Sequence, residues 1–166
     1  DCIHRASAVT HRHPRSKMAC GFFTLTVCEL LTGQNSTEAF AKALGAFRSF
    51  YEPDPWWAVE LDYFQFLLAG DLAQRPESEI DSGGYVLNTL PASLWCLLTT
   101  SSFEECVLKA VNLGGDTDTT GCVAGGLAGV HYGFSAIPEK WIQALARRGD
   151  VEALFSDFTR LTESKQ

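Results

Sequence analysis

The chain has 166 residues, of which 46% are hydrophobic and 20% charged, so its composition is that of a globular chain and not of a disordered one. Lysine and arginine number 13 and aspartate and glutamate 20, which gives a formal net charge of −7. An acidic chain is a poor non-specific nucleic-acid binder, so we expect no nucleic-acid partner. No stretch reaches the about 20 apolar residues that a membrane span needs, so we expect no membrane partner.

Six cysteines are spread along the chain without any Cys-x-x-Cys pair, which argues against a zinc knuckle or a thioredoxin-like site. A chain of this length with so much apolar material does not need a disulfide framework. Free cysteine behaves as a small core hydrophobe. We therefore expect core cysteines in a reducing, cytoplasmic setting.

The first half of the chain carries helical start and stop signals. Pro14 is placed as a first-turn proline and Gly33 as a C-terminal cap, with an apolar segment between them. An Asn-x-x-Glu pairing at Asn35 predicts a helix that starts there and runs to about residue 50. Pro55 opens a third helical segment over residues 56–68, which combines large aromatic side chains with two acidic ones.

The second half has the same character after an acidic, glycine-containing loop at residues 74–84. Helical signals resume at Pro91, and Ser102 and Glu105 have the spacing of a capping box. Further helices are predicted to start at three points: near residue 116, at Pro138 and at Asp150. No alternation of apolar and polar residues is long enough for a sheet. The pattern predicts one all-α domain of seven or eight helices over residues 1–166.

Residues 114–119 read Gly-Gly-Asp-Thr-Asp-Thr and stand just before a predicted helix. The two glycines permit backbone conformations that a side chain would forbid. Asp116 and Asp118 are two residues apart, so their carboxylates can converge on one point across a turn. Carboxylate and hydroxyl oxygens suit Mg²⁺, Mn²⁺ or Ca²⁺ better than zinc or copper. The segment therefore indicates a divalent-metal half-site.

Helix capping is the competing interpretation of the same residues. Asp and Thr at a helix start stabilise it by about 1 kcal/mol through the free N–H groups and the dipole, and on spacing alone the two interpretations are equally good. The helix that follows carries glycines every four residues, at Gly121, Gly125 and Gly129. Each interior glycine costs about 1 kcal/mol against alanine, so the stripe indicates the close approach of another helix. A helix packed in this way would hold the carboxylates rigidly.

Two further segments join this motif in a family resemblance. Residues 112–121, followed by the glycine-rich helix and Tyr132-Gly133, form the most specific match. Residues 7–14 contain Thr10-His11 ahead of Pro14 and look like a Thr-His segment that opens a central helix. Residues 82–90 begin Ser-Gly-Gly-Tyr-Val and look like a substrate loop. Together these segments resemble the ADP-ribosylglycohydrolase family.

The resemblance implies an all-α orthogonal bundle with two divalent ions, Mg²⁺ or Mn²⁺, beneath the ribose of ADP-ribose. By motif position the metal ligands would be Asp116, Asp118 and Thr119, with Asp118 touching both ions. The substrate-binding residues would be His11, Ser82, Gly83, Gly84 and Tyr85. The reaction would be metal-dependent hydrolysis of the glycosidic bond between ADP-ribose and a modified protein side chain or related ADP-ribose conjugate.

Family members have an additional N-terminal half with a second acidic metal motif and the acidic residue that assists hydrolysis, and these 166 residues contain neither. Two Asp and one Thr cannot fill the coordination spheres of two octahedral ions. We therefore expect the general acid or base to lie outside these residues, on a missing N-terminal segment or a complementary chain. The alternatives are a catalytically inactive relative that binds ADP-ribose or serves as a structural module, and one subunit of a split enzyme.

Overall fold

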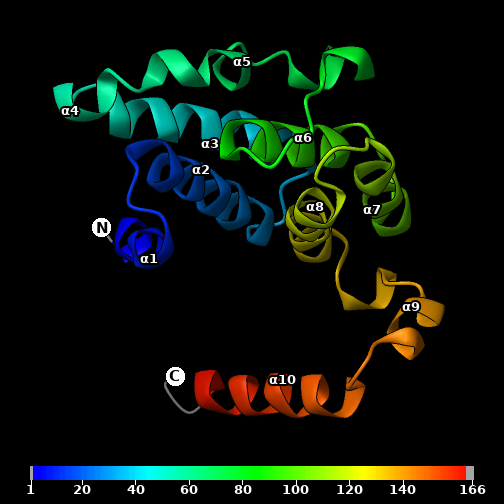
Figure 1. Ribbon diagram of the computed structural model, residues 1–166. Coiled ribbons are helices and arrows are strands. Elements are labelled where there is room, and N and C mark those ends of the chain that lie inside the picture. Colours follow the sequence, from blue (N-terminus) through cyan, green and yellow to red (C-terminus); the bar gives the residue numbers. More distant parts are fainter. Residues whose placement is uncertain (1, 164–166) are drawn as a thin grey trace. The chain divides into compact units, whose positions relative to one another are not determined.

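A computed structural model of the protein describes residues 2–163, and every regular element in that range is a helix (Figure 1). The all-α fold that the sequence predicts is confirmed. The chain divides into two compact units, residues 1–136 and residues 137–166. A single domain over residues 1–166 stays a prediction.

The first unit is built from α-helices joined by loops and 3₁₀ turns. The α-helices are α1 (Cys2–Thr10), α2 (Pro14–Leu31), α3 (Ser36–Tyr51), α4 (Pro55–Ala58), α5 (Gln65–Leu68), α6 (Val86–Leu98), α7 (Phe103–Asn112) and α8 (Thr117–Tyr132). The 3₁₀ turns are η1 (Leu61–Phe64), η2 (Leu72–Gln74), η3 (Glu77–Glu79) and η4 (Phe134–Ala136). Helix α6 is central, because it packs against α2, α3, α7 and α8.

Two predicted helix starts are confirmed by their capping hydrogen bonds. The Asn35 side chain accepts from the Glu38 N–H at 2.9 Å and begins α3. The Ser102 hydroxyl accepts from the Glu105 N–H at 3.2 Å and begins α7. The Glu105 carboxylate accepts from the Ser101 N–H at 2.9 Å and from the Ser101 hydroxyl at 2.8 Å. These donors lower the pKa of Glu105, the Ser101 N–H most of all.

Three predicted elements differ from the observed ones. The segment predicted as helical over residues 56–68 is divided into α4, the 3₁₀ turn η1 and α5. Helix α1 has no counterpart among the predicted elements; it packs against α2 and has no acidic residue in its first turn. Helix α6 starts at Val86, several residues before Pro91, which lies inside it. A proline removes one helical hydrogen bond, yet residues 89–97 are all buried. Burial on every side therefore outweighs the local helix-breaking tendency at this position.

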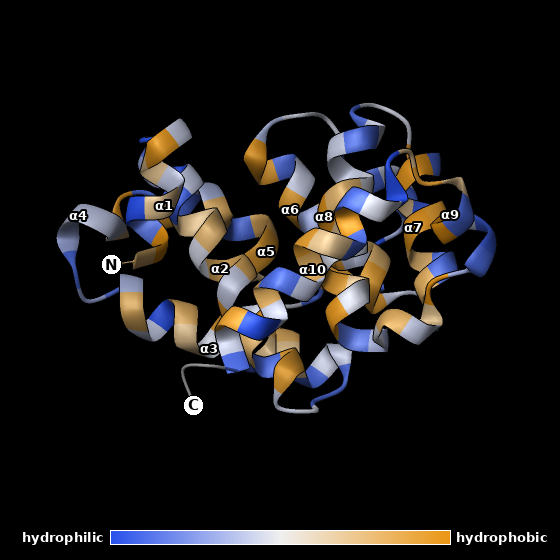
Figure 2. Ribbon diagram, turned by 90° about the horizontal axis from the view of Figure 1, so that it is seen from below, coloured by the Kyte–Doolittle hydropathy of each residue, from blue (hydrophilic) through white to orange (hydrophobic). Residues whose placement is uncertain are grey.

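The core is aromatic between α2 and α3 and aliphatic around α6 and α8. Phe22 lies 5.3 Å from Phe47 between ring centroids, and Phe47 lies 5.4 Å from Phe64, with all three rings buried. Around α6 and α8, small buried residues such as Ala124 and Ala128 allow close helix packing. Figure 2 shows hydrophobic residues running through α2 and α8.

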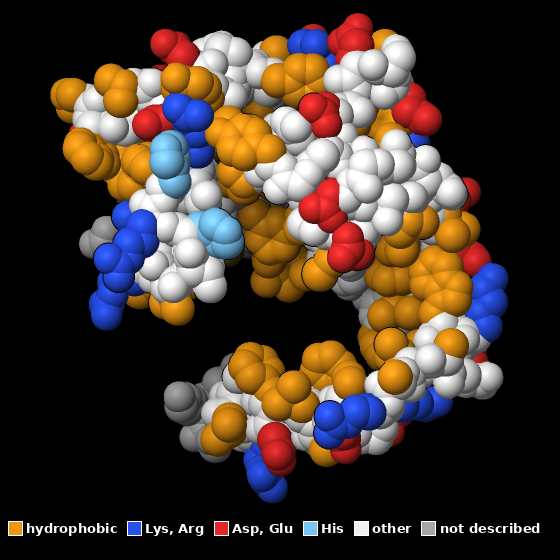
Figure 3. All heavy atoms as spheres, in the orientation of Figure 1, with side chains coloured by type: hydrophobic (Ala, Val, Ile, Leu, Met, Phe, Trp, Pro, Cys, Tyr) orange, Lys and Arg blue, Asp and Glu red, His pale blue; other side chains and the backbone are white. Residues whose placement is uncertain are grey.

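The second unit contains α9 (Glu139–Ala144) and α10 (Arg148–Glu163). Helix α10 begins at Arg148, so Asp150 lies in its first turn and pairs with Arg147 instead of capping it. Figure 3 shows hydrophobic side chains along α10. They include four exposed residues at helical spacing: Leu154, Phe155, Phe158 and Leu161.

Two expectations from composition can be compared with this structure. Within residues 2–163, no helix combines the length and the apolar character that crossing a bilayer requires. The six cysteines are free, but only Cys96 and Cys106 are buried core residues. Cys28 and Cys122 are exposed, because a position in an apolar run does not determine which face of a helix a residue occupies. The cytoplasmic location stays a prediction.

Candidate functional site

Two loops that are far apart in the sequence are hydrogen-bonded to each other at the starts of α6 and α8. The Asp116 N–H donates to the Ser82 carbonyl at 3.0 Å, and the Ser82 hydroxyl donates to the Gly114 carbonyl at 2.9 Å. Ser82 is buried. The loop predicted to hold metal and the loop predicted to hold substrate therefore form one structure, which we call the double loop (residues 81–85 and 114–119).

Glycine is required at the double loop for conformation and for space. Gly114 and Gly115 have φ angles of +80° and +65°, which other residues rarely adopt. A Cβ atom on Gly115 would lie 2.8 Å from the Ser82 carbonyl oxygen, closer than such atoms approach. A Cβ atom on Gly84 would overlap the Asp116 carboxylate. The two glycine pairs thus let the loops meet at this distance.

Asp116 is the N-cap of α8, so the capping interpretation is correct for this residue. Its carboxylate accepts from the Thr119 N–H at 3.4 Å. The pKa of Asp116 is lowered, chiefly by a hydrogen bond that the Thr119 side chain donates. Asp118 and Thr119 lie exposed in the first turn of α8. The carboxylates therefore gather at a positive helix end, where an anionic group is favoured.

A cation held at this place would need donors beyond those of the double loop. Within residues 2–163, no group of three or more His, Cys, Asp and Glu side chains is arranged to hold a metal ion. Asp116, Asp118 and Thr119 supply hard oxygen donors at one helix end, which fits part of the coordination sphere of Mg²⁺ or Mn²⁺. Their assignment as metal ligands stays a prediction.

Asp81 anchors residues 81–85 of the double loop and was not predicted as a site residue. Its carboxylate accepts from the Gly83 N–H at 2.8 Å and from the Asn88 side chain at 2.7 Å. The Thr89 hydroxyl donates to the Gly83 carbonyl at 3.1 Å. The only sequence signal for this anchor is an Asp two residues ahead of a Gly-Gly pair, which is common in turns.

Tyr85 ends the double loop as the N-cap residue of α6, and its side chain is 49% exposed. The Tyr85 hydroxyl accepts from Arg15 Nη1 at 3.2 Å. Arg15 Nε donates to the Glu60 carboxylate at 2.7 Å, and the Arg15 guanidinium lies 3.3 Å from the centroid of the Tyr63 ring. Sequence reasoning missed Arg15, although it directly follows Pro14 in the Thr-His segment.

His11 lies just after α1 and is exposed. Its Nδ1 atom is 3.1 Å from the Thr10 hydroxyl, in a hydrogen bond between neighbouring residues. The structure thus brings Ser82, Gly84 and Asp116 together and connects Tyr85 to the start of α2. Binding of substrate by His11 and by the loop residues stays a prediction.

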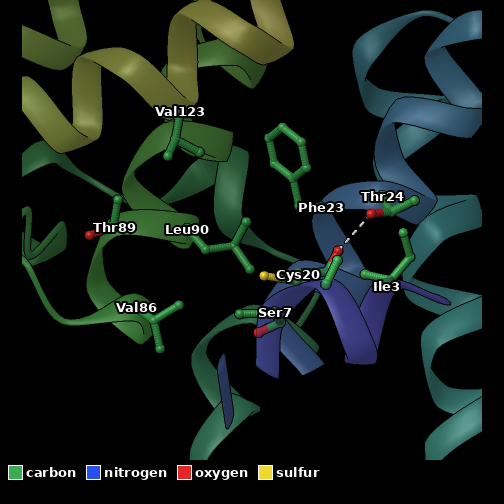
Figure 4. A pocket seen from close by; sticks show the side chains of 11 residues that line it. Ile3, Ser7, Cys20, Phe23, Thr24, Val86, Thr89, Leu90 and Val123 are labelled. Atoms are coloured by element: carbon green, nitrogen blue, oxygen red, sulfur yellow. Dashed lines mark hydrogen bonds between the residues drawn. The ribbon is translucent and has the colours of Figure 1, made fainter. Parts of the chain in front are cut away.

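The first unit has two cavities, one of which is lined by residues of the double loop. One, of about 330 Å³, lies beside Tyr85 and is lined also by Tyr63, Phe66 and Asn88. The other, of about 410 Å³, lies between α1, α2, α6 and α8 and is almost entirely apolar. Figure 4 shows side chains from these four helices pointing into it. They include Ile3, Cys20, Phe23, Leu90 and Val123. We call this second cavity the apolar groove.

Comparison with known proteins gives a consistent result. The sequence model of the ADP-ribosylglycohydrolase family matches residues 2–166. The chain is 30% identical over 148 residues to the ADP-ribosylarginine hydrolase Tri1 of Serratia proteamaculans (strain 568), covering 89% of this chain and 37% of that protein. It is 30% identical over 141 residues to the ADP-ribosyl-[dinitrogen reductase] glycohydrolase of Rhodospirillum rubrum, covering 82% of this chain and 40% of that protein.

A solved structure also matches. An ADP-ribosylglycohydrolase-related protein complex contains a chain that superposes with a TM-score of 0.73 at 34% identity, covering 91% of this chain and 49% of that one. The present chain thus spans less than half the length of these relatives. The match nevertheless covers both loops of the double loop and all the helices that support them. The chain therefore belongs to the ADP-ribosylglycohydrolase family.

Proposed function

We propose that the chain carries part of the active site of a metal-dependent ADP-ribosyl glycohydrolase. The observation that carries this proposal is the double loop, in which Asp116 is hydrogen-bonded to Ser82. This contact places the oxygen donors of Asp116 beside the Gly83-Gly84 pair. Because Gly84 has no side chain, its backbone can lie close to the Asp116 carboxylate. The substrate class is ADP-ribose attached to a protein side chain or a related conjugate, as the names of the relatives suggest.

In this proposal the residues of the double loop serve two tasks, metal binding and substrate binding. Asp116, Asp118 and Thr119 would hold Mg²⁺ or Mn²⁺, in a binuclear centre when the remaining donors are present. Bound ions would supply Lewis-acid stabilisation and a reactive water. Backbone N–H groups near Gly83 and Gly84 approach phosphate oxygens, and the Tyr85 ring stacks on the ligand. Hydrolysis adds water at the anomeric carbon, breaks its bond to the side chain and returns a proton to the leaving group.

The apolar groove supports a further part of the proposal, namely that the remaining metal-binding oxygen donors come from outside residues 1–166. An open cavity of about 410 Å³ with an apolar lining is unfavourable in water. The curated relatives are more than twice as long as the matched part. We infer that the groove receives an apolar-faced helical segment from the portion of the protein that corresponds to this additional length, and that this segment brings the missing acidic residues to the double loop.

Replacing Asp118 tests the enzymatic assignment. In the whole protein, Asp118→Ala should reduce ADP-ribose release from an ADP-ribosylarginine protein by at least about 100-fold, because it removes the donor that would touch both ions. Mn²⁺ binding followed by electron paramagnetic resonance should weaken in parallel. Asp157→Ala, which removes an exposed carboxylate on α10, is the matched control. Undiminished turnover of Asp118→Ala would refute the proposal, and a wild-type protein that binds ADP-ribose without turnover would favour the inactive relative.

The thiol of Cys20 reports on the groove, because it points into the cavity. In the whole protein the occupying segment should protect Cys20 from alkylation, while exposed Cys28 reacts. Mass spectrometry after brief iodoacetamide treatment measures both. Equal labelling of the two cysteines would show an open groove. Protection that depends on protein concentration would assign the groove to a second copy of the chain; either result contradicts the proposal.

A further inference from the structure

Arg15 makes three contacts that together fix its guanidinium. It lies at the start of α2, 70 residues before Tyr85, and donates to the Tyr85 hydroxyl at 3.2 Å. A second nitrogen donates to the Glu60 carboxylate at 2.7 Å. The guanidinium carbon lies over the Tyr63 ring, 3.3 Å from the ring centroid. The Arg15 side chain is 23% exposed and that of Glu60 16%, so water competes only in part for this ion pair.

The Tyr85 hydroxyl is hydrogen-bonded to the fixed guanidinium of Arg15. Tyr85 is half exposed, it follows the two glycines of the double loop, and it precedes the first turn of α6. Its hydroxyl is joined by the hydrogen bond from Arg15 to α2, a helix that is anchored in the core by Met18 and Phe22. Arg15 thus links the Tyr85 ring, which lines the cavity of about 330 Å³, to helix α2.

We propose that Arg15 is a positioning residue, which holds the Tyr85 ring in a single orientation for the ligand. The inference rests on the proposed function, because it assumes that Tyr85 stacks on the bound ADP-ribose. A ring that is oriented before binding loses less conformational freedom when the ligand arrives. Arg15 acts through Tyr85 and has no part in bond breaking, so its loss should weaken binding and leave the chemical step unchanged.

The geometry requires arginine and not a general cation. Nε and Nη1 of one planar group serve Glu60 and Tyr85 at the same time, while its carbon lies over the Tyr63 ring. A lysine ammonium is a point charge on a flexible stem and cannot reproduce the two hydrogen bonds together with the contact to the ring. Arg15→Lys therefore keeps the charge and removes the positioning.

A double-mutant cycle on the whole protein tests this inference. Arg15→Lys and Tyr85→Phe should each weaken ADP-ribose binding and raise KM about tenfold at unchanged kcat, the scale of one charge-assisted hydrogen bond. The double variant should bind no more weakly than either single variant, because both remove the same contact. Independent losses that multiply in the double variant would overturn the inference, as would a fall in kcat with unchanged KM. Arg48→Lys, at another ion-paired arginine, should leave both constants unchanged.

A measurement without ligand separates this inference from the proposed function. The chain has four tyrosines, so ring-labelled tyrosine gives a simple NMR spectrum. Arg15→Lys should shift and average the Tyr85 ring signals, while the signals of buried Tyr51 stay fixed. An unchanged Tyr85 signal would overturn the positioning role even if ADP-ribose binds. A wild-type protein that binds no ADP-ribose but shows the signal change would instead refute the proposed function and leave the contact itself established.

Discussion

Two tyrosines in the first unit each form a hydrogen bond with a basic side chain from a distant segment, yet their settings differ. Tyr51 and His4 are 47 residues apart, and the Tyr51 hydroxyl lies 2.6 Å from His4 Nε2. Tyr85 is bonded to Arg15 across 70 residues. Tyr51 is 2% exposed, while Tyr85 is 49% exposed.

Burial decides what each pair can do. The Tyr51 ring contacts those of Phe47, Phe50 and Trp57, with centroid distances of 4.6 to 5.5 Å. Burial raises the pKa of Tyr51 to about 12 and lowers that of His4, so both groups are neutral in the folded protein near neutral pH. The Tyr51–His4 pair therefore joins α1 to α3 as a structural contact. The Tyr85–Arg15 pair carries the charge of Arg15, and its tyrosine is half exposed.

Replacing each tyrosine with alanine should give the largest difference in the free energy of unfolding between the two sites. Tyr51→Ala should lower the free energy of unfolding by about 3–5 kcal/mol, because it leaves a large cavity in the aromatic core. Tyr85→Ala should change it by less than about 0.5 kcal/mol, as is usual for an exposed side chain. Urea unfolding followed by circular dichroism measures both values. Similar losses for the two variants would mean that Tyr85 is also part of the structural core.

Adding a methyl group beside Tyr51 should have a smaller effect. A Cβ atom on Gly21 in α2 would overlap the Tyr51 hydroxyl, whereas Gly45 in α3 has nothing within 4 Å of its Cβ position. Gly21→Ala should lower the free energy of unfolding by about 1–3 kcal/mol. The matched variant Gly45→Ala should raise it by about 0.5–1 kcal/mol, because alanine is the better helix former. Equal effects in the same unfolding assay would show that the Tyr51 hydroxyl moves freely.

Acidification should give the smallest change in the free energy of unfolding. Burial lowers the pKa values of His4 and His131 in the folded protein, so below about pH 6.5 the unfolded chain binds more protons than the folded one. The free energy of unfolding should therefore fall between about pH 7 and about pH 5. His4→Phe should show a shallower fall, since one of the two histidines no longer titrates. Stability that rises on acidification over this range would contradict the assignment of neutral histidines.

The sequence by itself determined the features that depend on neighbouring residues. The caps at Asn35 and Ser102 were predictable, because each needs only a side chain and an N–H group three residues later. The Gly114-Gly115 pair predicted a backbone conformation that other residues rarely adopt, and the φ angles of both glycines are positive. The motif that contains them was specific enough to indicate the family.

Only the tertiary structure decided which distant groups meet. The bond between Ser82 and Asp116 and the bond between Arg15 and Tyr85 join segments more than 30 residues apart, and no periodicity encodes such pairs. Helix α1 and the helical setting of Pro91 likewise follow from packing, because burial against neighbouring helices outweighs weak local preferences. A hydrogen bond at the site needs two partners within about 3 Å, and folding brings them there.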